Sequence, residues 1–210
     1  MMTVRFLLTL LFLMSASLCA ASDEVLRDYI PTGTITRFDE PIRFWVGGKD
    51  RLEGQYYIAT VVNEIQRIVP HLSITQTSSI GSANLRIYLT DSHQEWQEAI
   101  LQATSDSAGW TEYGHLIRGM TLVAHSPGGK IRRADIILHL DFQTSGGQKL
   151  WVVRHEFLHA LGVLGHPTRA RSTVLNSRQP QEEKNGLFSD SDILVLQTIY
   201  RPDLKTGGSW

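Results

Sequence analysis

Three residues within one short segment have types and a spacing suited to metal chemistry. The segment HEFLH places His155 and His159 four residues apart, with Glu156 directly after the first histidine. On a helix this spacing puts both imidazoles on one face, one turn apart. Their ring nitrogens can then converge on one zinc ion at about 2.0–2.1 Å, with Glu156 as general base on the zinc-bound water. The alternative is a pair of core histidines that hydrogen-bond within the protein.

The residues after this segment offer a third ligand. Gly162 follows His159 by three residues, and a glycine there can adopt the left-handed conformation that ends a helix and turns the chain. His166 follows after a short connection, so its side chain can return toward the metal. Three protein ligands and one water form the open arrangement of catalytic zinc sites. The alternative for His166 is a surface histidine before Pro167.

The segment HEFLHALGVLGH (155–166) resembles the H-E-x-x-H-x-x-G-x-x-H signature of the metzincin metallopeptidases. STVLNS (172–177) lies where metzincins have a methionine-containing turn beneath the metal, and LFSDSDILVLQTIY (187–200) is similar to the C-terminal helix of matrixin- and serralysin-like domains. The resemblance covers about residues 134–200. The N-terminal half more closely resembles a family of secreted bacterial proteins of unknown function, which share this layout and often end in a segment similar to IYRPDL (199–204).

The chain departs from the metzincin pattern at three positions. The signature has its third histidine at position 165, where this chain has Gly165, and His166 follows one residue later. Leu175 replaces the usual turn methionine. Because that methionine packs beneath the site without binding metal, a leucine of similar volume should cost little. Asn176 stands where some metzincins have a tyrosine.

The resemblance implies a metzincin-like zincin catalytic domain that acts as a zinc metalloendopeptidase. His155, His159 and His166 would hold Zn²⁺, and Glu156 would take a proton from the zinc-bound water and deliver it to the leaving amine. The substrate would be a peptide or protein, added as an extra strand at a free edge of 120–124 or 134–140. Two alternatives stay open: a zinc-stabilised or metal-free binding module without catalysis, and a purely structural exported domain.

Apolar patterning predicts the elements that position these side chains. Period-two alternation, or short β-branched runs bounded by turn residues, predicts strands, at 42–46, 72–76, 84–90, 120–124 and 134–140. Helical spacing of apolar residues predicts helices, at 58–69, 92–102, 148–162 and, after the capping-box-like pair Ser189 and Asp192, up to residue 200. Residues 22–33 are expected to be a polar lead-in. Long strand–helix–strand units are few, so we expect an α+β fold with a mixed twisted sheet flanked by helices.

The N-terminus has the features of a signal peptide. Arg5 precedes an apolar run over 6–14, and small residues follow, so residues 1–21 are expected to direct a domain of residues 22–210 to a secreted or periplasmic location. The run is shorter than the roughly 20 residues that span a bilayer, so no stable membrane insertion is expected. The alternative is an N-terminal anchor, which would also place the domain outside the cytoplasm.

Charge and cysteine content limit the partners and ligands. A net charge of −1 gives no electrostatic basis for binding nucleic acid. The single cysteine, Cys19, lies in the predicted signal peptide. Any metal in the mature chain must therefore be held by histidine, aspartate or glutamate. The sequence does not indicate an oligomeric state.

Overall fold

The computed structural model describes residues 23–49, 51–90, 92, 94–95, 98, 119–139, 145–168, 172–176 and 187–210. The predicted signal peptide and most of the helix predicted at 92–102 lie outside these residues, so both stay predictions. None of the helices within the described ranges combines the length and apolarity that crossing a bilayer requires.

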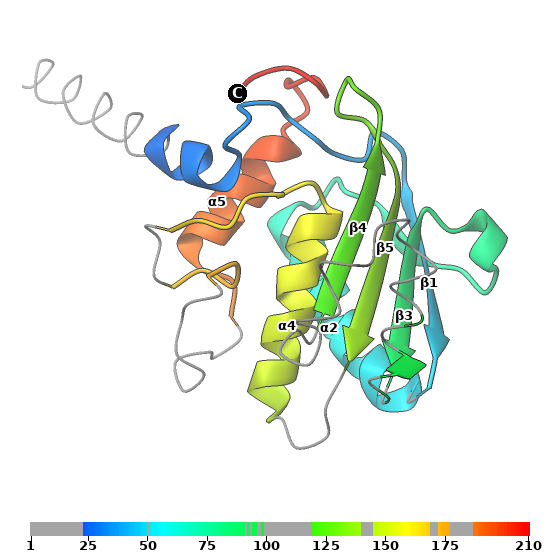
Figure 1. The fold of residues 1–210 in the computed structure, drawn as a ribbon. Coiled ribbons are helices and arrows are strands. Elements are labelled where there is room, and N and C mark those ends of the chain that lie inside the picture. Colours follow the sequence, from blue (N-terminus) through cyan, green and yellow to red (C-terminus); the bar gives the residue numbers. More distant parts are fainter. Residues whose placement is uncertain are drawn as a thin grey trace, which may run out of the picture.

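Five strands form one mixed sheet, in the order β2-β1-β3-β5-β4 (Figure 1). They are β1 (Ile42–Gly48), β2 (Ile74–Gln76), β3 (Leu85–Thr90), β4 (Gly119–His125) and β5 (Ile131–His139). The first three and β5 run parallel, whereas β4 is antiparallel to β5 at one border of the sheet. The α+β fold with a mixed sheet and the five strand predictions are confirmed. Because β5 pairs on both sides, the prediction of a free edge at 134–140 is wrong.

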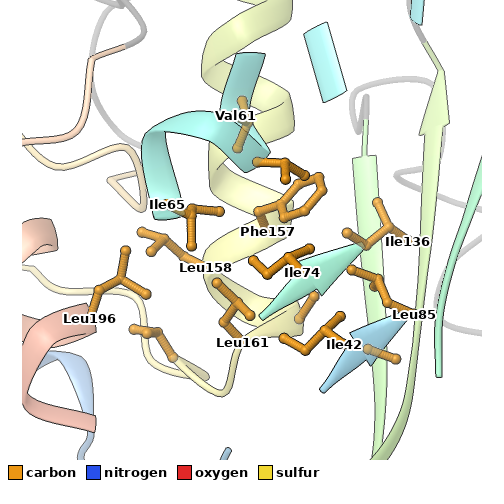
Figure 2. Close-up of a cluster of buried hydrophobic side chains, with 14 of the residues drawn as sticks. Ile42, Val61, Ile65, Ile74, Leu85, Ile136, Phe157, Leu158, Leu161 and Leu196 are labelled. Atoms are coloured by element: carbon orange, nitrogen blue, oxygen red, sulfur yellow. The ribbon is translucent and has the colours of Figure 1, made fainter. Parts of the chain in front are cut away.

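Helices α2 (Arg51–Ile68) and α4 (Gly146–Ala160) pack on the sheet through one apolar cluster. Figure 2 shows Phe157 of α4 between Val61 of α2 and Ile136 of the sheet. The residues of α2 that recur at helical spacing are the buried ones, as the pattern predicts: Ile58, Val61, Val62 and Ile65. This cluster fixes α4, and with it the HEFLH segment, against the sheet.

Helix α5 (Asp190–Ile199) starts at the predicted cap. The Ser189 hydroxyl accepts the Asp192 backbone N–H, and the Asp192 side chain accepts the Ser189 N–H in return, which forms a capping box. Beyond α5, the Arg37 guanidinium donates to the carbonyl oxygens of Ile199 at 2.8 Å and Leu204 at 2.6 Å. The segment before β1 therefore holds the C-terminal residues.

The expectation of a polar lead-in at 22–33 is wrong. Residues 23–29 form a helix that lies beside α5 in Figure 1, and Leu26, Tyr29 and Ile30 are buried. Two helical turns are too few for an apolar period to stand out, and so short a helix is marginal alone in water. Its stability comes from packing on the rest of the domain, which the local pattern does not reveal.

Candidate metal centre

Helix α4 carries three of the four predicted site residues. Its first turn is closed by a capping box between Ser145 and Gln148, so the helix starts at a fixed residue. His155 is 9% exposed and Glu156 is 5% exposed. Two imidazoles and a carboxylate in a mostly buried helix cost free energy unless other groups compensate them.

The end of α4 turns the chain back over His159. Gly162 N–H donates to His159 O at 2.9 Å and Val163 N–H donates to Leu158 O at 3.0 Å, which is the Schellman pattern. Gly162 has φ +104°, and a Cβ there would lie 1.8 Å from Thr36 O. The predicted left-handed glycine is thus confirmed, and both its conformation and its surroundings exclude a side chain.

The three predicted ligands meet through their Nε2 atoms. The distances are 3.1 Å between His155 and His159, 3.2 Å between His159 and His166, and 3.4 Å between His166 and His155. A tetrahedral zinc ion with Zn–N bonds of the usual length needs nitrogens about 3.3 Å apart. Within the described residues these histidines are the cluster whose ligand atoms could hold a metal ion.

Backbone carbonyls fix the tautomers of two of these rings. His155 Nδ1 lies 2.8 Å from Val174 O, and His159 Nδ1 lies 2.7 Å from Val163 O. A carbonyl only accepts, so each Nδ1 carries a proton, and in the tautomer protonated at Nδ1 the Nε2 atom is the metal-binding nitrogen. Two such nitrogens at 3.1 Å cannot hydrogen-bond with each other. A cation between them can bind both nitrogens, so the donor set fits a metal ion.

Burial keeps the imidazoles in the form that binds metal. It lowers the pKa of His159 to about 4, although the hydrogen bond to the Val163 carbonyl oxygen opposes part of this decrease. It also lowers the pKa of His166. The imidazoles of His159 and His166 are therefore neutral at pH 7, which is the form that binds a metal ion.

The Glu156 carboxyl group lies against strand β4. Thr121 Oγ1 donates to Glu156 Oε2 at 2.7 Å, and a Cβ on Gly119 would lie 2.8 Å from Glu156 Oε1. Burial raises the pKa of Glu156 to about 7, and the Thr121 hydrogen bond lowers it in part. A carboxyl group that exchanges its proton near neutrality suits a general base.

A turn over residues 173–176 lies next to the first histidine. Asn176 N–H donates to Thr173 O at 3.1 Å, and Val174 in this turn is the carbonyl partner of His155. Leu175 is fully buried, as expected for a residue in place of the turn methionine. The last residue of the predicted 172–177 segment lies outside the described residues.

The structure brings His155, His159 and His166 together and places Glu156 beside them on α4, as the spacing predicts. It also shows contacts that the sequence did not suggest. Thr121 holds the Glu156 carboxyl group, and Asp192, for which the sequence favours a helix cap over a metal ligand, also accepts hydrogen bonds from Tyr29 and Thr173. Local sequence spacing could not predict these contacts, because the two partners of each hydrogen bond lie in helices, strands or turns that are far apart in the sequence.

Comparison with protein families assigns the chain to one family. The model of the family described as "Protein of unknown function (DUF2927)" matches residues 19–210, so the chain belongs to this family. This agrees with the layout that resembles a family of unknown function, while the metzincin resemblance stays a prediction. No relative among curated proteins matches the chain.

Proposed function

We propose that this member of the DUF2927 family is a secreted, zinc-dependent metalloendopeptidase of the metzincin type. The observation that carries the proposal is the convergence of three Nε2 atoms within 3.4 Å of one another, beside a buried Glu156. Structural zinc sites have four protein ligands, whereas catalytic sites have three and leave one position open. Three histidines therefore favour a catalytic site.

The chemistry of the donor set supports zinc. Imidazole nitrogens suit zinc and other late first-row metals, whereas calcium and magnesium prefer oxygen ligands. The N···N spacing fits the tetrahedral geometry that zinc adopts. When bound, zinc would polarise the scissile carbonyl group and make the attacking water more acidic.

The chain's own residues supply the proton transfers. Glu156 accepts a proton from the attacking water and holds it for the amine that leaves when the peptide bond breaks. Thr121 keeps the acceptor oxygen in place through its 2.7 Å hydrogen bond. Burial of the carboxyl group strengthens its interaction with charge that develops in the site, because the local dielectric is low.

The position of β4 suggests how a peptide is held. Among the described strands β4 pairs only with β5, and we propose that a peptide substrate adds as a strand at the other edge of β4. Thr121 lies on β4 and contacts Glu156. A peptide added to this edge would therefore run close to the general base.

The test uses the mature chain purified without a metal-binding tag. Elemental analysis is expected to find about one zinc per chain, and a peptide library is expected to be cleaved by wild type but not by Glu156→Gln. Bound zinc without hydrolysis of any peptide or protein would favour the non-catalytic binding module. No zinc in the purified protein, even after reconstitution, would overturn the proposal.

A further inference from the structure

We propose that Asp192 is a positioning residue for the metal centre. Its carboxylate connects the N-terminal helix (residues 23–29) to the first and third histidines. This inference rests on the proposed metal site. Asp192 lies on α5, is fully buried, and has no direct contact with any of the three imidazoles among its described hydrogen bonds. Its influence would pass through two short chains of hydrogen bonds, one from each carboxylate oxygen.

Asp192 accepts more hydrogen bonds than a helix cap needs. Its Oδ2 accepts from the Ser189 hydroxyl at 2.8 Å and from the backbone N–H groups of Ser189 at 2.9 Å and Val174 at 3.2 Å. Its Oδ1 accepts from Tyr29 Oη at 2.9 Å and from Thr173 Oγ1. All five donors are neutral, and a buried carboxylate is tolerated when its oxygens are satisfied in this way. The capping box uses only the Ser189 donors, so the other three bonds serve a different purpose.

The first chain of bonds leads to His155. Asp192 Oδ2 accepts the Val174 N–H, and Val174 O accepts the His155 Nδ1–H at 2.8 Å. Thr173 supports the same turn, because its hydroxyl donates to Asp192 Oδ1 and accepts the Leu175 N–H at 3.1 Å. The carboxylate thus holds Val174 in place through its N–H group, and the carbonyl oxygen of the same residue sets the tautomer and direction of the first ligand. Such outer partners of metal ligands typically change metal affinity by about 10–100-fold when they are removed.

The second chain of bonds leads to His166. Tyr29 Oη donates to Asp192, while the Tyr29 carbonyl oxygen accepts the Gly165 N–H at 3.1 Å, directly before His166. A Cβ on residue 165 would lie 2.4 Å from that same oxygen, so the close approach requires glycine. After the histidine, Asp28 Oδ1 accepts the Thr168 N–H at 3.3 Å. Residues 28 and 29 therefore hold the loop on both sides of His166.

The hydrogen bond between Gly165 and Tyr29 explains how His166 still reaches the site, although it stands one residue later than the third histidine of the metzincin signature. The extra residue, Gly165, is held to the backbone of the N-terminal helix, and that helix is held to α5 by Asp192. A loop fixed at both ends presents its ligand with less loss of conformational freedom on binding. The geometry points to Tyr29 and Asp192 as the pair that aligns the third ligand.

The experiment measures zinc affinity by competition with a chelator in the mature full chain. Tyr29→Phe removes only the hydroxyl and is expected to weaken zinc binding about tenfold. Tyr57→Phe is the matched control, because it removes a tyrosine hydroxyl that donates to a different carboxylate, Glu53. That control is expected to keep the wild-type zinc affinity. The Co²⁺-loaded protein gives a second readout, since the ligand-field bands of Tyr29→Phe should shift toward those of His166→Ala.

A double-mutant cycle separates positioning from a general loss of stability. In a His166→Ala background the Tyr29→Phe change should have no further effect on zinc affinity, whereas Asp192→Asn should still weaken it through His155. The inference is overturned if Tyr29→Phe leaves the affinity unchanged in wild type, or lowers it equally in both backgrounds. If wild type itself binds no zinc, the proposed function fails first, and the inference falls with it. Tyr29→Phe still provides the test if Asp192→Asn does not fold.

Discussion

Thr121 Oγ1 lies 2.7 Å from Glu156 Oε2 and 3.0 Å from the Glu156 carbonyl oxygen, so one hydroxyl contacts both the side chain and the backbone of this residue. The contact joins the border strand β4 to helix α4 beside the histidines. It restricts the Glu156 carboxyl group to one orientation and pairs an oxygen whose burial without a partner would cost free energy.

Replacement of Thr121 by valine should reduce peptide hydrolysis without loss of metal. Valine has nearly the same shape but cannot donate to Glu156, and a hydrogen bond to a charged group contributes about 1.5–3 kcal/mol. We expect kcat/KM to fall about tenfold or more, with zinc content at the wild-type level. Thr121→Ser, which keeps the hydroxyl, should restore most of the activity. Equal rates for valine and serine would contradict this role.

Replacement of Glu156 by glutamine should abolish hydrolysis and leave zinc bound. The amide cannot accept the proton of the attacking water, and general bases contribute about 10²–10⁴-fold to rates. The three histidines keep their contacts, so elemental analysis should give the same zinc content as wild type. A variant that still cleaves peptides at the wild-type rate would remove Glu156 from the mechanism.

Replacement of His166 by alanine should weaken zinc binding by about 100-fold or more, because one of three nitrogen ligands is lost. Wild type should also lose thermal stability on treatment with a chelator. Zinc at 1,000 times its Kd contributes about 4 kcal/mol to the free energy of unfolding. In His166→Ala the chelator should have a smaller effect. Identical melting shifts in both proteins would show that the third histidine does not bind the metal.

The metal-free protein should show two opposing pH dependences. Burial raises the pKa of Glu156 from 4.5 to about 7, so its contribution to stability is present below pH 4.5 and is lost as pH rises through 7. Burial lowers the pKa of His159 from 6.5 to about 4, so its contribution is present above pH 6.5 and is lost as pH falls toward 4.

Between pH 4.5 and 6.5 the effects of Glu156 and His159 should nearly cancel in wild type, which leaves the rise with pH that His166 contributes. Glu156→Gln removes one of them, so its free energy of unfolding should rise with pH by on the order of 3 kcal/mol. His166, whose pKa is also lowered, adds in the same direction. Urea unfolding in the presence of a chelator at several pH values measures both curves. Parallel curves for the two proteins would contradict the assignment of a raised pKa to Glu156.

Replacement of Gly162 by alanine should destabilise the domain strongly. The residue has φ +104°, and its Cβ would lie 1.8 Å from Thr36 O, so strain and a backbone clash add together. We expect the free energy of unfolding to fall by at least about 2 kcal/mol. Gly128→Ala is the control, because the nearest heavy atom to its added Cβ lies 3.9 Å away. Comparable urea midpoints for the two variants would rule out this account of the turn.

The sequence predicts the part of the site that is built from neighbours in the chain. The spacing of His155 and His159, the glycine at 162 and the Ser189 cap are local signals, and each one depends on helix geometry alone. The strands also follow from local alternation. The order of the strands and the antiparallel direction of β4 do not, because no residue pattern specifies which edges pair.

The supporting contacts could not be predicted for the same physical reason. Thr121 and Glu156 are 35 residues apart, and Tyr29 and Asp192 are 163 residues apart. Serine followed by aspartate three positions later predicts a helix cap, and this prediction is confirmed at Ser189. The same aspartate gives no sign that its second oxygen faces a tyrosine from the other end of the domain.

The contacts between the ends of the domain have a consequence for the order of assembly. The first and third histidines are only eleven positions apart in the sequence, whereas Arg37 is 162 positions from Ile199 and 167 from Leu204. Closure of such long loops costs entropy before the contacts repay it, and contacts of this kind slow folding. A growing chain would therefore contain all three histidines before Asp192 and the C-terminal residues that complete their surroundings. Alignment of the proposed metal site would then be completed late in folding, when the segment around Arg37 meets residues 199–204.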